Sequence, residues 1–398
     1  MKKIFIVFLM MSLMLGNTSA VWADSSSSIE LSLDNIKPII LENNLDMQTA
    51  DNNEKKAEED YNNLLDDVND KEDEVTAKKT EISNYNTEIS NFKLAEDGSN
   101  SDDLTTLKTN LKTATNDLNT LNTDLDNLEQ QKTTKRYSVK TATVTYNQTV
   151  EKAIYTAQQD YINYLSILAD KETKKNEIKS NERDLSVFNL KYSQGFAAKS
   201  DGDTYNLKET TLNNDLSQIN TKADAALKDL KTALGVDQST EIKFDNSIDK
   251  DLQDILQINF DKDTQTMLQN NFNIQLQNLS IDELNNKQDQ DDSSVSDYEI
   301  DNAQISLEQK TIDAKTNFKS QYDTLMTSYN TLKGDYDTLK NYQTQFNTMN
   351  AQYSYGFASK QQVDDLNTQI VNQNSVIDNQ KNQLYLNYLH YVQMKEGY

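Results

Sequence analysis

The chain contains no cysteine and only one histidine, His390. Disulfide bonds therefore cannot form, and the fold must be held together by packing alone. Cysteine nucleophiles and the His/Cys sites that bind zinc are excluded as well. No glycine-rich phosphate loop is present, and His390 fits a helix-surface position better than a catalytic one. We therefore expect neither an enzyme nor a cofactor.

Proline and glycine are also scarce, with one proline and eight glycines among 398 residues. Ordinary chains contain about 5% proline and about 7% glycine. Because both residues interrupt helices, their near absence permits very long ones. Hydrophobic residues make up only 35%, which favours thin rods in which each helix buries one narrow stripe. No segment reads as a convincing strand, so we predict an all-α fold.

Basic residues are few relative to acidic ones, 39 against 64, and the formal net charge is −25. Such a chain is poorly suited to nucleic acid or to anionic membrane surfaces, which are themselves negative. The aspartates at 289, 291 and 292 resemble a calcium loop only superficially. The glycine at the sixth position and the spaced glutamate are both missing. We expect no metal site.

The N-terminus has the pattern of an export signal. Lys2 and Lys3 precede an apolar run from Ile4 to Leu15, and Val21-Trp22-Ala23 fits the small-x-small pattern before a cleavage point, with Ala20 as the other candidate. The predicted signal peptide is 1–23, followed by a serine-rich lead at 24–29. An uncleaved membrane anchor is the alternative. Either way we expect the protein in the cell envelope or outside the cell.

Two sequence motifs occur twice, in the same order. Tyr192-Ser-Gln-Gly-Phe-Ala-Ala-Lys199 recurs as Tyr353-Ser-Tyr-Gly-Phe-Ala-Ser-Lys360, and each copy is preceded by a related motif, at 40–47 and at 267–274. Ordered internal repeats indicate a tandem duplication. We predict a first repeat at 30–235, a linker at 236–251 and a second repeat at 252–398.

The first repeat contains an extra segment at 57–135. Leucines and one alanine from Leu104 to Leu128 are spaced three and four residues apart, and apolar residues from Tyr61 to Phe92 keep one heptad frame. The polar stretch 96–102 between them reads as a turn. The pattern predicts an inserted antiparallel coiled-coil hairpin with Gly98 at its tip and arms of about 45 Å. A similar seam predicts one long helix at 298–353.

The repeated unit, a long helix followed by Tyr-x-x-Gly and a returning helix, resembles the TolC family of outer-membrane efflux ducts. The openings Leu31–Asn35 and Leu41–Asn44 and the ending Ala233–Gly235 strengthen this resemblance. It implies a homotrimeric tube of helices that serves as the exit duct of an efflux or secretion system. It also implies that hairpin tips engage a periplasmic adaptor (membrane fusion) protein, which links to a cognate transporter.

The sequence departs from that family in the first half of each repeat, where the family has membrane β-hairpins. Here the first repeat has the insertion 57–135, and the second has only a short polar break at 287–297. Neither alternates apolar and polar residues as a membrane strand does, so we do not expect insertion in an outer membrane. The alternative function is a non-conducting extracytoplasmic scaffold or surface structural protein.

The two tips are the candidate functional residues: Tyr192, Gly195, Phe196, Tyr353, Gly356 and Phe357. A purely structural explanation is that each glycine closes a helix in the left-handed conformation and each phenylalanine packs back on that helix. Ser359 to Gln362 would then be a capping box for the returning helix, and Ser200 to Asp203 its looser counterpart. The alternative explanation is that the same exposed turns dock a partner.

The resemblance also implies acidic residues near the tips that narrow the duct entrance. Asp201 and Asp365 match two of these positions, whereas Gln362 departs from a third.

Overall fold

The computed structural model describes residues 28–94, 101–244, 253–291 and 294–398. The predicted signal peptide and the hairpin tip at Gly98 lie outside these ranges. The described elements are β1 (Ser28–Leu31), α1 (Ile36–Asn43), α2 (Leu45–Leu94), α3 (Ser101–Ser193), α4 (Lys199–Leu234), β2 (Glu241–Phe244), α5 (Gln253–Leu256), α6 (Phe260–Asn270), α7 (Phe272–Gln290), α8 (Asp297–Ser354) and α9 (Lys360–Glu396). The all-α expectation is confirmed, and the predicted seam at 298–353 lies within α8.

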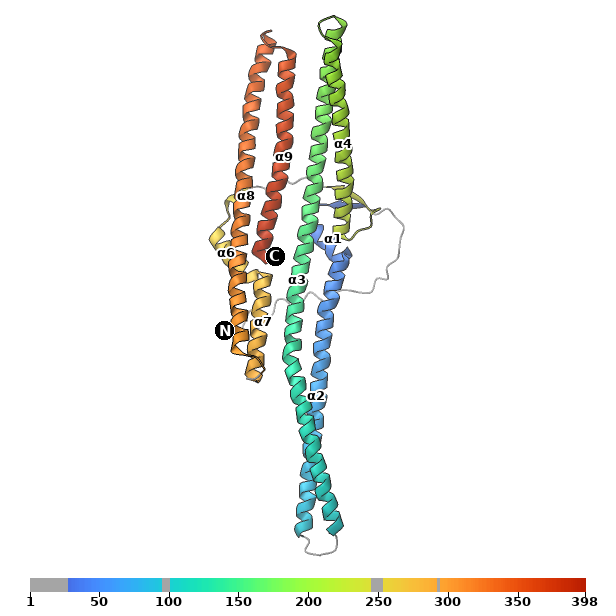
Figure 1. The fold of residues 1–398 in the computed structure, drawn as a ribbon, viewed down its shortest axis with the longest axis vertical. Helices are drawn as coiled ribbons and strands as arrows, with labels where there is room; N and C mark the ends of the chain where they lie inside the picture. Colours follow the sequence, from blue (N-terminus) through green and yellow to red (C-terminus); the bar gives the residue numbers. More distant parts are fainter. Residues whose placement is uncertain (1–27, 95–100, 245–252, 292–293) are drawn as a thin grey trace.

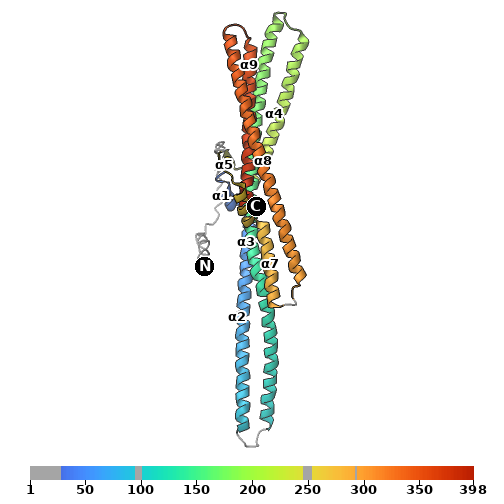
Figure 2. The same ribbon diagram turned by 90° about the vertical axis from the view of Figure 1, so that its left-hand side faces the viewer.

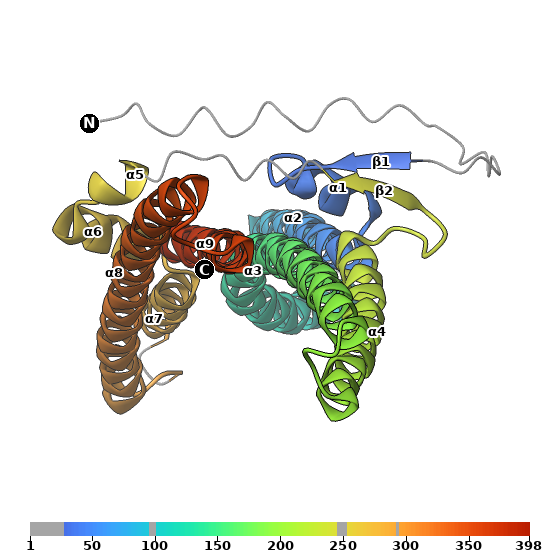
Figure 3. The ribbon, with the colours of Figure 1, turned by 90° about the horizontal axis from the view of Figure 1, so that it is seen from above.

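The helices form a long, narrow rod (Figure 1). The hairpins α3–α4 and α8–α9 project toward one end, and α2–α3 projects toward the other, accompanied for part of its length by α7 and α8 (Figures 1 and 2). Viewed along the rod, the helices form a curved layer with α8 at one edge and α4 at the opposite edge (Figure 3). The predicted repeat of helical hairpins is therefore present.

The middle of the rod contains two apolar clusters, and α9 of the second repeat contributes Tyr385 to the first of them. The first is built around α1, α3 and the end of α4, and includes Tyr161 and Leu230. The second joins α6, α8 and α9 through Phe318, Leu325 and Tyr391. Helices α3 and α9 pack between them, with hydrogen bonds such as that from Asn382 Nδ2 to Ser166 Oγ at 3.2 Å. Apolar packing is thus concentrated where the two repeats meet.

The predicted coiled-coil hairpin forms between α2 and the first half of α3. Leu64, Val68, Val75 and Ile89 on one arm and Ala114 on the other are buried. Ion pairs join the arms, with Lys78 Nζ 3.4 Å from Asp117 Oδ2 and Lys135 Nζ 3.0 Å from Asp60 Oδ2. Both arms continue without a break into the helices of the first repeat.

Two short strands are a correction to the expectation that the chain has none. Strand β1 pairs in parallel with β2, with Ser28 opposite Glu241 and Leu31 opposite Phe244. Both strands do alternate polar and apolar residues, as Ser-Ile-Glu-Leu and Glu-Ile-Lys-Phe, but four residues is the shortest run at which such alternation indicates a strand. The two strands also lie more than 200 residues apart, at the start of the first repeat and in the linker that follows it, so only the folded chain brings them together.

Candidate functional site: the hairpin tips

Both tips use the same backbone motif to end a helix. Gly195 has φ 78° and Gly356 has φ 76°, as the left-handed prediction required. The Gly195 N–H donates to the Tyr192 carbonyl at 3.0 Å, and the Phe196 N–H donates to the Lys191 carbonyl at 2.9 Å. At the second tip, the N–H groups of Gly356 and Phe357 make the same two bonds, to Tyr353 and Gln352. Each tip is therefore a Schellman motif.

The phenylalanine rings do not pack back on their helices, which corrects one half of the structural explanation. Phe196 is 80% exposed and Phe357 is 84% exposed. Tyr192 and Tyr353 are also exposed, on the last turns of α3 and α8. The backbone hydrogen bonds complete the cap without any help from the rings. Helix termination therefore leaves the two exposed phenylalanines unexplained.

The two returning helices are capped differently. At α9 the predicted capping box is confirmed: the Gln362 N–H donates to Ser359 Oγ at 3.3 Å, and the Ser359 N–H donates to Gln362 Oε1 at 2.8 Å. The predicted box at Ser200 to Asp203 is wrong, because α4 begins at Lys199 with Ala198 as its N-cap. An alanine has no capping oxygen, so the residue type could not mark this start.

The two predicted entrance acids lie in different environments. Asp201 Oδ2 accepts a hydrogen bond from the Ala198 N–H at 3.3 Å, so this carboxylate supports the first turn of α4. Asp365 Oδ1 lies 3.6 Å from Arg183 Nη2, so an ion pair joins α9 of the second repeat to α3 of the first. Sequence reasoning did not identify Arg183, since its partner is distant in the chain.

An aromatic cluster below the first tip was also missed. The Phe188 ring lies 6.0 Å from that of Tyr192 and 5.6 Å from that of Tyr205, between centroids. A Cβ atom on Gly202 would lie 2.6 Å from the Phe188 ring. Glycine at 202 therefore lets α4 approach this ring closely. The only signal in the sequence was a glycine near the start of a helix.

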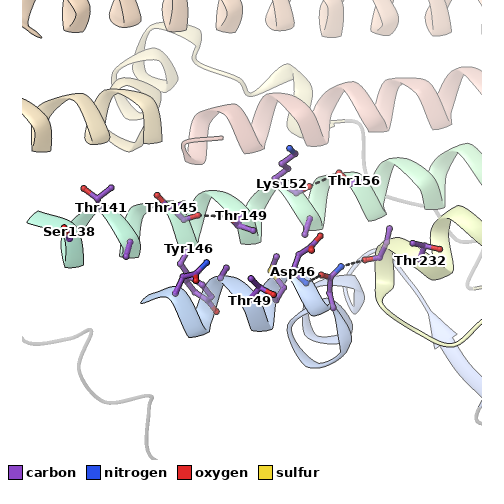
Figure 4. Close-up of a pocket in the computed structure, with 17 residues that line it drawn as sticks. Asp46, Thr49, Ser138, Thr141, Thr145, Tyr146, Thr149, Lys152, Thr156 and Thr232 are labelled. Atoms are coloured by element: carbon purple, nitrogen blue, oxygen red, sulfur yellow. Dashed lines mark hydrogen bonds between the residues drawn. The ribbon is translucent and has the colours of Figure 1, made fainter. Parts of the chain in front are cut away.

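A second candidate, a groove between α2 and α3, consists mostly of threonine, serine and alanine side chains (Figure 4). Thr149 Oγ1 donates to the Thr145 carbonyl at 2.8 Å, and Thr156 Oγ1 donates to the Lys152 carbonyl at 3.0 Å. These hydroxyl protons are thus engaged by the backbone of their own helix. The groove offers a surface for close packing more than a site for chemistry.

The remaining candidates are the titratable side chains of the described residues. No cluster of three or more His, Cys, Asp or Glu side chains there could bind a metal ion. His390 stacks on Tyr155 with 4.9 Å between ring centroids, and burial lowers its pKa. In the part of the chain that the structure covers, none of the helices has the length and apolarity that a membrane span requires.

Comparison with known proteins was informative at the level of structure alone. No protein-family model matches the sequence, and neither does any curated protein. The CmeC outer membrane channel of Campylobacter jejuni is similar with a TM-score of 0.61 and 10% identity, over 97% of this chain and 94% of that one. The outer-membrane channel OprN gives a TM-score of 0.51 and 10% identity, over 68% and 72%.

The chain has the fold of the TolC-family outer-membrane channels. A membrane protein from Pseudomonas aeruginosa is similar as well, with a TM-score of 0.51 and 9% identity, over 67% of this chain and 73% of that one. The resemblance first noted in the repeated motifs is therefore confirmed for the fold. In this TolC-type fold the tips with Phe196 and Phe357 lie at the same end of the rod (Figure 1).

Proposed function

We propose that this protein is the exit-duct component of an efflux or secretion system and that its two hairpin tips engage an adaptor protein. The adaptor would be of the periplasmic membrane-fusion type and would link the duct to a cognate transporter. The duct itself would be a homotrimer in the cell envelope, exported by its signal peptide and without catalysis of its own. The TolC-type fold supports the proposal as a whole.

The observation that carries the adaptor proposal is the pair of exposed phenylalanines at two turns with the same backbone motif. An exposed aromatic ring lowers solubility and contributes nothing to the fold, yet it is present at both tips. Aromatic side chains that a partner covers are frequent centres of binding energy. Because both tips project from the same end of the rod (Figures 1 and 2), one ring-shaped assembly could present all of them together.

Assembly of several copies has a separate support on α8. Tyr298, Ile305 and Ile312 are spaced seven residues apart and are all exposed. Residues at this spacing form one stripe on a helix, and α8 lies at an edge of the curved layer (Figure 3). A neighbouring copy would cover this stripe. Light scattering on the purified mature chain tests this directly, and a monomer at micromolar concentration would contradict the trimer.

The tip proposal is tested with the double variant Phe196→Ala/Phe357→Ala. Because both rings are exposed, the free energy of unfolding should change by less than about 0.5 kcal/mol. The variant should stay folded and abundant, yet lose cross-linking to the adaptor and lose transport. Leu256→Ala, which removes an exposed apolar side chain away from the tips, should change neither. Normal cross-linking and transport by the folded double variant would refute adaptor docking.

A non-conducting scaffold is the second candidate, and the coiled-coil hairpin favours it. The arms of α2 and α3 extend well beyond α7 and the lower end of α8 (Figure 2). A long projecting hairpin is a common means of spanning distance between partners. A strain without the protein that exports all tested compounds normally, but has an altered envelope, would favour the scaffold over the duct.

A further inference from the structure

The two tips share a backbone motif but differ in the side chains beside it. On the first hairpin Val187, Leu190 and Leu207 are exposed, with Leu190 at 61% and Leu207 at 69%. Aligning Gly195 with Gly356 places Thr348, Ala351 and Thr368 at the corresponding positions of the second hairpin. Only the first tip therefore adds exposed aliphatic side chains to its phenylalanine.

The tips also differ in charge. Residues 186–208 contain Lys191, Lys199 and Lys208 against Asp201 and Asp203. Residues 347–369 contain Lys360 against Asp364 and Asp365. The first tip therefore carries three lysines where the second carries one, on a chain whose net charge is −25, although Glu209 directly follows the last of the three.

The charges of the second tip are also partly satisfied within the protein. Lys360 Nζ lies 3.4 Å from Asp364 Oδ1, and Asp365 pairs with Arg183. The three lysines of the first tip are exposed, and within the described residues no carboxylate lies at ion-pair distance from them. Leu190 and Lys191 follow Val187 by three and four residues, so each neighbours Val187 on the surface of α3. An apolar surface and unpaired positive charge thus occur together.

We infer that the tips are not equivalent and that the α3–α4 tip is the main docking surface, for a protein whose contact surface places carboxylates beside apolar side chains. The inference rests on the proposed function, because it names the tip and the chemistry through which the adaptor would bind. Burial of the aliphatic side chains supplies affinity, and the lysines steer an acidic partner into register. At the second tip the exposed rings of Tyr355 and Phe357 offer apolar contact, but without this charge complementarity.

An anionic membrane is the competing occupant of an apolar and basic patch. Lysines near such a surface are attracted to it, but two aspartates lie among these three lysines. The remainder of the chain is strongly negative and is repelled by an anionic surface. The charge distribution therefore favours a protein partner with a small acidic surface over an extended lipid surface.

The test exchanges the side chains of the two tips. The first variant gives the first tip the side chains of the second: Val187→Thr, Leu190→Ala, Lys191→Gln, Leu207→Thr and Lys208→Gln. The second variant is the reverse exchange: Thr348→Val, Ala351→Leu, Gln352→Lys, Thr368→Leu and Gln369→Lys. Both variants keep Gly195, Gly356 and both phenylalanines, so the turns should be unchanged. Circular dichroism and protein level confirm that each variant folds.

Partner contact is measured in the intact host by photo-cross-linking, with benzoylphenylalanine placed at Gln194 or at the matched position Tyr355. In the parent protein, adducts with the adaptor should be at least about fivefold more abundant from 194 than from 355. The first variant should reduce the yield at 194 about tenfold, whereas the reverse exchange should raise the yield at 355. In detergent-solubilised complexes, retention of the adaptor should fall with added salt in the parent and much less in the first variant.

Equal yields at the two positions, or an unchanged yield in the first variant, would overturn the inference while leaving adaptor docking intact. Absence of adaptor adducts at both positions would overturn the proposed function together with the inference. Flotation of the purified chain with vesicles containing phosphatidylserine tests whether the patch binds an anionic membrane instead. Binding to these vesicles that Lys191→Gln/Lys208→Gln abolishes, without loss of adaptor adducts, would assign the patch to lipid and contradict the inference.

Discussion

The side-chain amide of Asn44 donates a hydrogen bond to the backbone carbonyl of Ala233 at 2.9 Å, and so ties the start of α2 to the end of α4. The second repeat has a related hydrogen bond from the other asparagine of its motif: Asn270, which aligns with Asn43, donates through Nδ2 to the Lys395 carbonyl at 3.3 Å. Each tie is accompanied by a glycine, Gly235 or Gly397, that ends the returning helix with a positive φ. The asparagine pairs at 43–44 and 270–271 thus mark where the start of each repeat meets the end of its returning helix.

Asn44→Ala should lower the free energy of unfolding by about 1–2 kcal/mol, because the Ala233 carbonyl loses its partner in a partly buried setting. Gly235→Ala should cost more than Asn44→Ala. A Cβ at position 235 would lie 2.6 Å from the Asn43 backbone, and the residue has φ 73°. Urea denaturation followed by circular dichroism measures both. Equal stability of Gly235→Ala and the parent would contradict the packing at this closure.

Gly334→Ala should have the opposite effect. Gly334 lies inside α8, and a Cβ there would have no neighbour within 4 Å. Alanine is favoured over glycine in a helix interior by about 1 kcal/mol, so the variant should be more stable by about 0.5–1 kcal/mol. The same denaturation experiment measures it. A destabilised Gly334→Ala variant would indicate that another chain contacts this face of α8.

Tyr391→Phe should destabilise the second repeat. The ring is buried, and its hydroxyl donates to Asp263 Oδ2 at 2.9 Å. Burial, together with this carboxylate, raises the pKa of Tyr391. Losing the hydrogen bond should cost about 1–2 kcal/mol, measured as a shift in the denaturation midpoint. Tyr336→Phe, on an exposed part of α8, is the control and should change stability by less than about 0.5 kcal/mol.

His390 should make stability depend on pH. Burial lowers the pKa of its imidazole below the ordinary 6.5, so the folded chain binds this proton less readily than the unfolded chain does. The stability due to neutral His390 is complete above pH 6.5, and is lost as the pH falls through the lowered pKa. The parent should therefore lose more stability than His390→Gln between pH 7.5 and pH 5. Parallel losses in the two proteins would contradict this.

Most of the coiled-coil hairpin should be removable if the deletion keeps the residues of its arms that contact α7. Gln290 Nε2 donates to Thr133 Oγ1 at 2.8 Å, and Asn286 Nδ2 donates to the Tyr137 hydroxyl at 2.9 Å, so the base of the hairpin contacts α7. Replacing residues 68–127 with a short Gly/Ser turn should preserve cooperative unfolding and helicity per residue. Replacing residues 57–135 also removes Thr133, so it should lower the midpoint of urea denaturation more than the shorter deletion does. Loss of cooperative unfolding in the shorter deletion would show that the arms support the repeats.

The features that the sequence revealed were those encoded within a few helical turns. The scarcity of glycine and proline predicted long helices, and the heptad seams predicted which faces of α2, α3 and α8 are buried. Gly195 and Gly356 predicted left-handed helix ends, and Ser359 with Gln362 predicted a capping box. In each case the interacting groups lie close together in the chain, so their spacing alone carries the information.

Tertiary structure alone decided the exposure of Phe196 and Phe357, the pairing of Asp365 with Arg183, and the pairing of β1 with β2. The start of α4 at Lys199 also escaped prediction, because Ala198 has no capping side chain. Whether a ring at a helix end is covered depends on which distant segments pack beside it, and an ion pair between α3 and α9 depends on how two repeats meet. Local spacing determined the helices of this protein, and the packing of distant segments determined which of their side chains stay exposed.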